Sequence, residues 1–600
     1  MNGRTEPELG PWNPGLSSKL PSAALSLSTV YRSENIVGCL DQALERSAFT
    51  GLEPENLVAF RPERLVVHEL LIRVTGDFSV PDGKRYADLG INFRNIVDTI
   101  LKRDILLKMA DIIESYEALR RGLKDEIARE LAHLKTVASP PPIKRPTPHP
   151  LLRWLGFEKE AAVSSATGTE SRDIESGVLA EWRREGRESV KPRRRRVCRA
   201  LADVAEALSI KHGRLPSDTQ AIADIALDRA LNDHGSAVIG GMIEPLIAEA
   251  VAREGYRLLP AQAEPVIMNV KGASAAGKST LRPLQRRLAE RLGIDWADFG
   301  LISPDIWRKY LLDYDSLGEF SRYAGTLTGH ELRIIDQKLD RYMAEKAKLG
   351  AMSHLLIDRF RFDSFAETEG GEQGARLLTR FGSTIYMFFV ITPPEATVER
   401  AWGRGLQFGR FKAVDDLLHH NVEAFTGMPD LFFTWALRKD KNVHYEFLDN
   451  SVPLGERPRT VAFGWNGDMT ILDIKSFLNV DRYRRIDINA RSPEQVYPDV
   501  DCMAPTCNTD FLKRCVKEIT CIQVADQESG RILARIENGK PCWIDPEALD
   551  QVPFHPDIEA GMAILVPDEL RAQAEFGKET AFLDFGEAPT LGAFGPHRKD

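Results

Sequence analysis

The residues with the clearest chemical potential form one short loop between two apolar segments. The stretch Gly272-Ala-Ser-Ala-Ala-Gly277-Lys278-Ser279 matches the phosphate-loop pattern G-x4-G-K-[ST]. Small residues let backbone N–H groups close around phosphate oxygens at the positive end of the helix that follows. Lys278 can reach the β- and γ-phosphates, and the Ser279 hydroxyl can bind Mg²⁺. We therefore expect ATP and Mg²⁺ to bind at Gly272, Ala273, Ser274, Ala275, Ala276, Gly277, Lys278, Ser279 and Thr280.

Two carboxylates follow apolar segments farther along the chain. Asp305 comes just after the predicted strand 299–302, and Asp358 directly follows the predicted strand 354–357. Ligands of parallel α/β sheets bind beyond the carboxyl ends of the strands, so both carboxylates would face the nucleotide. We expect Asp305 to accept the proton of an attacking hydroxyl, with a helix cap as the alternative. Asp358 would hold Mg²⁺ or position the acceptor.

A third group of candidates is cationic. A helix is predicted to open at Thr392-Pro-Pro-Glu395, which has the form of a capping box with proline at the first helical position. Arg400 and Arg404 share a face of this helix, and three glycines then precede Arg410. The pattern predicts a lid whose arginines act on the transferred phosphoryl group. The alternative is an amphipathic surface helix with unpaired arginines.

Further residues are candidates for binding the acceptor. His330 lies in Thr328-Gly-His-Glu331, which also fits a capping box before an amphipathic helix, so its role could be structural. The residues that we expect to contact the acceptor are Arg308, His330, Asp358 and Arg361.

Together these motifs resemble the zeta toxin family of P-loop kinases. The similar features are the loop 272–280, the D-x-x-R step at Asp305–Arg308, the helix entry at Thr328–Glu331, the strand LLID ending at Asp358 with Arg361 behind it, and the three lid arginines. They cover roughly residues 259–450. Members of this family typically phosphorylate the sugar of UDP-N-acetylglucosamine, and related enzymes act on other nucleotides.

The resemblance implies a role for each matched residue. Lys278 and Ser279 would bind ATP and Mg²⁺, Asp305 would be the base, and the lid arginines would stabilise the migrating phosphoryl group. The sequence has Ser274-Ala275 where the family commonly has Pro-Gly, and Asp358-Arg359-Phe360 where it commonly has an E-G-T-like turn. Because the second difference falls among acceptor-contacting residues, the acceptor could instead be a dinucleotide, a nucleoside or a nucleic-acid end.

A doubly wound parallel α/β sheet would position these residues. The apolar run 266–270 before the loop is predicted to be a buried strand, and Leu281, Leu284, Leu288 and Leu292 recur at helical spacing after it. Further strands are predicted at 299–302, 354–357, 384–391 and 443–448. Beyond them, Asn466-Gly467 and Asn538-Gly539 predict two hairpins.

The rest of the chain divides by composition. We expect a partly disordered segment at 1–50, an α+β or helical domain at 51–138, a Pro- and Ser-rich linker at 139–176, a helical region at 177–258, the P-loop kinase domain at 259–480 and a β-rich domain at 481–600. Periodic apolar residues from 96 to 134 predict one long helix, or two helices broken near Gly122. Residues 183–199 hold eight Arg and one Lys against two Glu, a phosphate-binding patch or a solvated turn between two helices with Pro192 as the breaker.

Composition limits the class of protein. The 600 residues are 43% hydrophobic and carry a net charge of −9, which excludes a fibrous chain and disfavours general coating of nucleic acid. No apolar stretch approaches a membrane span and no signal peptide is evident, so we expect a cytoplasmic protein. The seven cysteines lack the paired spacing of a zinc site and are expected to be reduced thiols.

These observations predict a P-loop phosphotransferase, an ATP-dependent kinase that acts on a hydroxyl of a nucleotide-like small molecule. Two alternatives remain open. One is a polynucleotide 5′-hydroxyl kinase that uses the patch at 183–199 to guide the strand. The other is a nucleotide-gated switch that binds ATP without phosphoryl transfer.

Overall fold

The computed structural model describes residues 9–85, 87–138, 167–216, 219–359, 378–453, 455–571, 574–576, 581–584 and 588–595. The chain is of mixed α/β class and forms two compact units. Unit 1 comprises Met1–Ala24, Ile72–Ile96 and Gly255–Asp600, and unit 2 comprises Leu25–Leu71 and Val97–Glu254. The predicted P-loop thus lies in unit 1, and the arginine-rich segment lies in unit 2.

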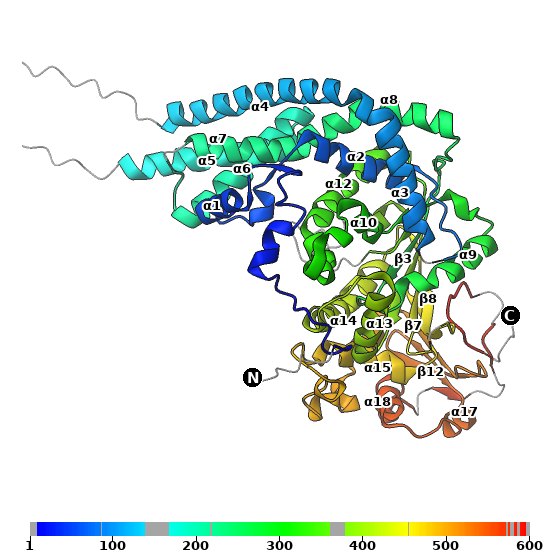
Figure 1. The fold of residues 1–600 in the computed structure, drawn as a ribbon. Coiled ribbons are helices and arrows are strands. Elements are labelled where there is room, and N and C mark those ends of the chain that lie inside the picture. The colour runs from blue at the N-terminus through cyan, green and yellow to red at the C-terminus, as the bar shows by residue number, and fades with distance from the viewer. Residues whose placement is uncertain are drawn as a thin grey trace, which may run out of the picture. The chain divides into compact units, whose positions relative to one another are not determined.

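Unit 2 is mostly helical (Figure 1). A two-stranded antiparallel sheet pairs β1 (Ile36–Val37) with β2 (Ala59–Phe60). The helix α2 (Pro62–Asp77) begins directly afterwards, and its residues up to Leu71 belong to this unit. The other helices of this unit are α1 (Leu40–Thr50), α4 (Met109–Ala138), α5 (Thr167–Glu188), α6 (Pro192–His212), α7 (Thr219–Ala230) and α8 (Ser236–Glu254).

The predicted long helix is interrupted earlier than expected. The helix α3 (Asp88–Ile100) is separated from α4 by a π-helical turn at Leu101–Ile105 and a 3₁₀ turn at Leu106–Lys108. Gly122, the expected break, lies inside α4 without a kink. A Cβ at this position would lie 2.9 Å from the guanidinium of Arg193 on α6, so the glycine allows close packing of two helices and does not end one.

The arginine-rich segment spans two helices, as one of its two interpretations predicted. Helix α5 ends at Glu188, and α6 begins at Pro192 in the first helical position. Several of its arginines face acidic side chains of unit 2. These ion pairs are Arg183–Glu206, Arg193–Glu126, Arg194–Glu130 and Arg196–Asp233.

One helical run in the described residues is apolar enough to cross a membrane by length and composition. It covers Thr219–Glu254, and its best 18-residue window has a mean hydropathy of 1.3. This corrects the expectation that no stretch approaches a span. The run consists of α7, a π-helical turn at Leu231–Gly235 and α8. A single helix of this kind is weak evidence for a membrane, because core helices of soluble proteins have the same composition.

Unit 1 is built on a sheet of eleven strands within the described chain. Five parallel strands form one half, in the order β4-β5-β3-β6-β7. Their bounds are β3 (Val266–Lys271), β4 (Phe299–Ile302), β5 (His354–Ile357), β6 (Thr384–Ile391) and β7 (Asn442–Asp449), which confirms the five strand predictions to within a residue at each end. After β3 the chain forms β4 and β5 on one side of β3, and it then crosses to form β6 on the other side. The carboxyl end of β3 is therefore a topological switch point.

These strands are apolar because both faces of the sheet are covered. In β6, Met387 and Phe389 pack into a cluster with α14 (Val414–Ala436), α15 (Ile474–Arg482) and α16 (Asp510–Glu518). The alternate residues Tyr386 and Phe388 face a second cluster that includes Leu288 of α9 (Arg282–Arg291). Side chains alternate between the faces of a strand, so burial on both sides gives a continuous apolar run.

The second half of the sheet is mixed and continues from β7. Strands β8 (Arg459–Trp465) and β9 (Asp468–Ile471) form the hairpin predicted at Asn466-Gly467, and β11 (Ile532–Glu537) and β12 (Lys540–Ile544) form the one predicted at Asn538-Gly539. Both asparagines have positive φ, which such tight turns require. The remaining elements are β10 (Cys521–Ala525), β13 (Glu575–Phe576), α17 (Pro546–Asp550), α18 (Pro556–Leu565) and α19 (Asp568–Arg571). The segment from 481 onward therefore extends the same sheet and also carries four helices among the described residues.

Candidate functional site

The phosphate-loop motif forms a tight loop directly after β3. Gly277 has φ 94°, and a Cβ there would lie 2.3 Å from the Asn450 amide nitrogen. Ala275 also has positive φ, 62°, at the second position of the dipeptide that is commonly Pro-Gly in the zeta toxin family. The loop leads through a 3₁₀ turn at Lys278–Leu281 into α9, as the sequence predicted.

Lys278 crosses this loop. Its ammonium group donates hydrogen bonds to the carbonyl oxygens of Gly272 at 3.1 Å and Ala273 at 2.9 Å. Burial lowers the pKa of Lys278, and the neighbouring cations Arg404 and Arg410 lower it further, against the opposing effect of Asp358 and Asp305. An anionic ligand would stabilise the charged form of a lysine in these surroundings.

Ser279 and Asp358 form a pair of oxygen ligands beside the loop. The Ser279 hydroxyl donates to the Asp358 carboxylate at 2.8 Å, and the Asp358 backbone N–H donates to Ile302 O at the end of β4. One hydroxyl and one carboxylate are the donors that Mg²⁺ takes from proteins that bind it together with nucleotide phosphates. The two residues therefore fit the predicted ion. Elsewhere, no group of three His, Cys, Asp or Glu side chains within the described ranges is arranged to hold a metal.

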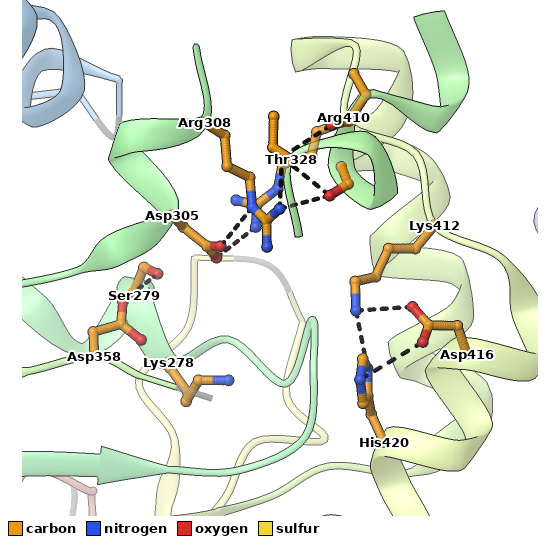
Figure 2. A network of polar contacts seen from close by, with 12 residues as sticks. Lys278, Ser279, Asp305, Arg308, Thr328, Asp358, Arg410, Lys412, Asp416 and His420 are labelled. Atoms are coloured by element: carbon orange, nitrogen blue, oxygen red, sulfur yellow. Dashed lines mark hydrogen bonds and ion pairs between the residues drawn. The ribbon is translucent and has the colours of Figure 1, made fainter. Parts of the chain in front are cut away.

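Asp305 is held between two arginines. Its carboxylate lies 3.0 Å from Arg308 Nε and 2.5 Å from Arg410 Nη2 (Figure 2). Arg308 is itself oriented by Thr328 Oγ1 at 2.8 Å and by the Gly325 carbonyl. Burial raises the pKa of Asp305, but Arg410 and Arg308 outweigh it and hold the pKa well below its ordinary value. The carboxylate is therefore ionised at every physiological pH.

Both predicted capping boxes are wrong, since neither threonine caps its helix. Helix α12 (Gly329–Lys348) follows Thr328 without a side-chain cap, because the Thr328 hydroxyl bonds to Ala324 O and accepts from Arg308. Helix α13 (Pro394–Phe408) begins after Pro393, and the buried Thr392 hydroxyl donates to Ala276 O in the phosphate loop. Each threonine has the sequence pattern of a helix cap, but its hydroxyl bonds to a residue distant in sequence, Arg308 for Thr328 and Ala276 for Thr392.

The three lid arginines have different surroundings. Arg400 on α13 donates to Asn450 O at 2.7 Å and Val452 O at 3.2 Å, so it anchors the loop after β7. Arg404 lies close enough to Lys278 to lower its pKa. Arg410, just beyond α13, binds Asp305. The structure thus brings Arg404 and Arg410 to the lysine and the carboxylates and gives Arg400 backbone partners.

No protein-family model matches this chain, and no curated protein or solved structure is significantly similar to it. The zeta toxin resemblance therefore stays a prediction that rests on the motifs.

The other two predicted acceptor-binding residues are His330 and Arg361. His330 is half-buried in the first turn of α12. Arg361 lies outside the described residues. The described cysteines carry free thiols.

Sequence reasoning missed two side chains that support the loop. The Asn450 amide donates to Ala276 O at 2.7 Å, the same carbonyl that Thr392 binds. Asn450 follows β7, and Thr392 follows β6. Both strands were predicted, and a polar residue within two positions of each predicted strand end was the signal that could have found these contacts.

A cluster of three further polar residues was also missed. Lys412 precedes α14, and its ammonium group lies 2.9 Å from His420 Nδ1 and 3.1 Å from Asp416 Oδ2 (Figure 2). Asp416 and His420 follow at intervals of four residues on one face of α14. The i, i+4, i+8 spacing of Lys, Asp and His was visible in the sequence, but nothing there indicated which way that face points.

Proposed function

We propose that unit 1 is an ATP-dependent kinase that transfers the γ-phosphoryl group of ATP to a hydroxyl of a nucleotide-like small molecule. One observation carries this proposal: a lysine-bearing phosphate loop, a serine–carboxylate pair and an arginine-bound aspartate follow three neighbouring parallel strands, β3, β5 and β4. Each group has a separate task in phosphoryl transfer.

The loop and its lysine would bind the triphosphate. Backbone N–H groups of residues 273–279 and the Lys278 ammonium would neutralise the phosphate oxygens, exchanging the present bonds to Gly272 O and Ala273 O for stronger ones to phosphate. Ser279 and Asp358 would hold Mg²⁺, which supplies charge neutralisation at the phosphates.

Asp305 would orient the acceptor hydroxyl. In the transfer, the hydroxyl oxygen forms a bond to the γ-phosphorus, the bond from that phosphorus to the bridging oxygen breaks, and ADP leaves with its electron pair. The hydroxyl proton passes to the Asp305 carboxylate and from there to water. Arg404 and Arg410 would stabilise the charge on the phosphoryl oxygens as it shifts.

The low pKa of Asp305 bears on this role, because a strongly depressed pKa makes a weak proton acceptor. Arg410 contributes most to that depression after burial has raised the pKa. Phosphate oxygens would compete with Asp305 for the Arg410 guanidinium. Once Arg410 turns to the phosphates, the carboxylate loses one counter-charge and becomes more basic.

The nucleic-acid alternative has less support. Arg193, Arg194 and Arg196 already face acidic partners, which reduces the charge that the patch offers to a phosphate backbone. We propose a cytoplasmic location and a nucleotide or nucleotide-sugar acceptor.

The test is incubation with γ-labelled ATP, Mg²⁺ and a panel of nucleotides, nucleotide sugars, nucleosides and 5′-hydroxyl oligonucleotides, followed by mass spectrometry. Label on a small nucleotide-like acceptor, lost in Lys278→Ala, is the expected result. Label on oligonucleotide ends would favour a polynucleotide kinase. ATP binding without transfer to any member of the panel would favour the switch and count against the kinase.

A further inference from the structure

Lys412 occupies an unusual electrostatic position for a lysine that only stabilises a fold. Its side chain is 22% exposed, and Asp416 is its one carboxylate partner within the described part of the chain. Arg308 and Arg410, the two cations that bind Asp305, lie near enough to Lys412 to lower its pKa. An anion that bound beside these three cations would offset the repulsion between their like charges.

The hydrogen bonds of Lys412 leave one donor for a ligand. An ammonium group carries three N–H donors. His420 Nδ1 and Asp416 Oδ2 take two of them, and no third partner of Lys412 occurs among the residues that the structure describes. In Figure 2 the Lys412 ammonium group lies on the side of its backbone that faces Lys278, Asp305 and Arg308.

His420 acts here as a neutral acceptor. Because its Nδ1 meets an ammonium group, that nitrogen carries a lone pair, and the ring proton lies on Nε2, 3.6 Å from Asp416 Oδ1. Burial and the charge of Lys412 lower the pKa of His420 to about 3, against the opposing effect of Asp416. The neutral imidazole therefore orients the Lys412 side chain by accepting a hydrogen bond, and it leaves the positive charge of the ammonium group unneutralised.

We propose that Lys412 is a second phosphate-binding lysine of the site, in addition to Lys278, and that Asp416 and His420 are its positioning residues. The phosphate is either the γ-phosphate of ATP or a phosphate carried by the acceptor. This inference rests on the proposed function for the identity of the site, since it assigns the nucleotide to the loop 272–280. Lys278 binds the nucleotide from the phosphate loop, and Lys412 binds this γ- or acceptor phosphate from the segment between α13 and α14.

The protonation of Lys412 gives a supporting readout. Burial lowers its pKa to about 8, with Arg308 and Arg410 acting in the same direction and Asp416 opposing them. Lys412 binds phosphate in its protonated form, so affinity for phosphate should fall as pH rises through about 8. The charged and titratable groups that face this cluster are Asp416, His419, His420, Arg308, Arg410 and Lys278.

Equilibrium binding to the full chain tests the proposal without requiring transfer. ATP, ADP, and a nucleoside 5′-monophosphate added to the ADP·Mg²⁺-bound protein serve as probes for Lys412→Met, Lys412→Arg and wild type. The matched control is Lys348→Met, because Lys348 is an exposed lysine with one carboxylate partner, Glu345, at the end of α12. Thermal unfolding of each variant shows whether the fold is retained.

We expect Lys412→Met to weaken one probe at least tenfold. Loss for ATP with ADP unchanged assigns the γ-phosphate, and loss for the monophosphate alone assigns an acceptor phosphate. Lys412→Arg should retain binding and remove the fall in affinity near pH 8. Affinities within twofold of wild type for all probes, or equal losses for ATP and ADP, would overturn the proposal.

The positioning role has its own comparison. His420→Leu removes the acceptor for Lys412 and should weaken the same probe as Lys412→Met, whereas His420→Asn keeps a neutral acceptor near Nδ1 and should restore most of the affinity. Equal affinities of the two variants would refute positioning by His420. Since wild type can bind phosphate without transferring it, failure of the kinase proposal and failure of this one give different results.

Discussion

Ala275 holds a backbone conformation that an L side chain rarely adopts. Its φ of 62° lies in the left-handed region, which costs a non-glycine residue about 1–2 kcal/mol. Its methyl group packs against a cluster that includes Val398 and Leu417, and this contact offsets part of the strain. The phosphate loop is thus shaped by packing as well as by its glycines.

Substitution of Ala275 tests this account. Glycine relieves the strain but loses the methyl contacts, so Ala275→Gly should change stability by less than about 1 kcal/mol and leave ATP binding intact. Ala275→Val places a β-branched side chain at positive φ and should cost roughly 2 kcal/mol and weaken ATP binding. Thermal unfolding and ATP titration measure both effects. A valine variant as stable as wild type would show that the loop relaxes to another conformation.

Asp305 gives a second prediction at the scale of the residue. Asp305→Asn keeps the size of the side chain but removes its charge and basicity, so transfer should fall at least ~10²-fold. ATP affinity should be retained or rise, because Arg308 and Arg410 lose a competing anion. Initial rates and ATP titration give the two values. Normal turnover by this variant, together with an inactive Asp358→Asn, would move the base to Asp358.

The pH profile provides a check on the same residue. The pKa of Asp305 is depressed in the free protein, so the carboxylate stays ionised until pH falls below its usual range near 3.8. No acidic limb from Asp305 should therefore appear in kcat/KM between pH 5 and 8. A limb in that range that disappears in Asp305→Asn would contradict the observed ion pairs.

At the scale of the element, α13 carries Arg400, and Arg410 follows its end. These two arginines have different roles. Arg400 binds the carbonyls of Asn450 and Val452, and Asn450 in turn holds the Ala276 carbonyl of the phosphate loop. Arg400 therefore supports the loop through the segment after β7. Arg410 instead forms an ion pair with the Asp305 carboxylate, for which a phosphate group can substitute.

Two alanine variants separate these roles. Arg410→Ala should lower kcat by about 10²–10³ with a smaller change in the KM for ATP, because it removes charge stabilisation that grows in the transition state. Arg400→Ala should instead raise the KM for ATP and lower Tm, with kcat changed less than about fivefold. Steady-state kinetics and thermal unfolding provide the comparison. The reverse pattern would make Arg400 the catalytic cation.

At the scale of the whole molecule, the chain near its end folds back onto β7. The Glu446 carboxylate is fully buried and accepts hydrogen bonds from Leu591 N at 2.7 Å, Gly592 N at 2.9 Å and Thr460 Oγ1 at 2.8 Å. Burial raises its pKa to about 7, although these three bonds oppose the rise. The Glu446 carboxylate therefore helps to attach the segment 588–595 to the sheet, together with backbone hydrogen bonds of Ala593 to Thr460 and Pro458.

This attachment should depend on pH. Between the unfolded pKa near 4.5 and the folded pKa near 7, the folded state holds a proton that the unfolded state has lost, so the contribution of Glu446 to stability falls as pH rises through that window. Glu446→Gln cannot ionise and should lack this dependence. The Tm of wild type relative to the variant should therefore decrease from pH 4.5 to 7. A constant difference across this range would show that Glu446 titrates normally.

The sequence by itself determined the parallel half of the sheet and the position of its central loop. Runs such as TIYMFFVI, 384–391, are apolar at every position because a strand covered on both faces has no polar side, and that signal is local. The phosphate loop and the two Asn-Gly turns depend on backbone conformations that particular residue types favour, so spacing alone located them.

Only the tertiary structure decided which partner each polar side chain takes. Thr392 and Thr328 have the local pattern of helix caps, yet one binds Ala276 O and the other orients Arg308, since a hydroxyl bonds to whichever buried partner packing brings to it. The same holds for Arg400, whose two carbonyl partners lie 50 and 52 residues away in sequence. Helical spacing placed Lys412, Asp416 and His420 together, but the side of α14 that meets the site depends on which face packs against the sheet, which is a non-local choice.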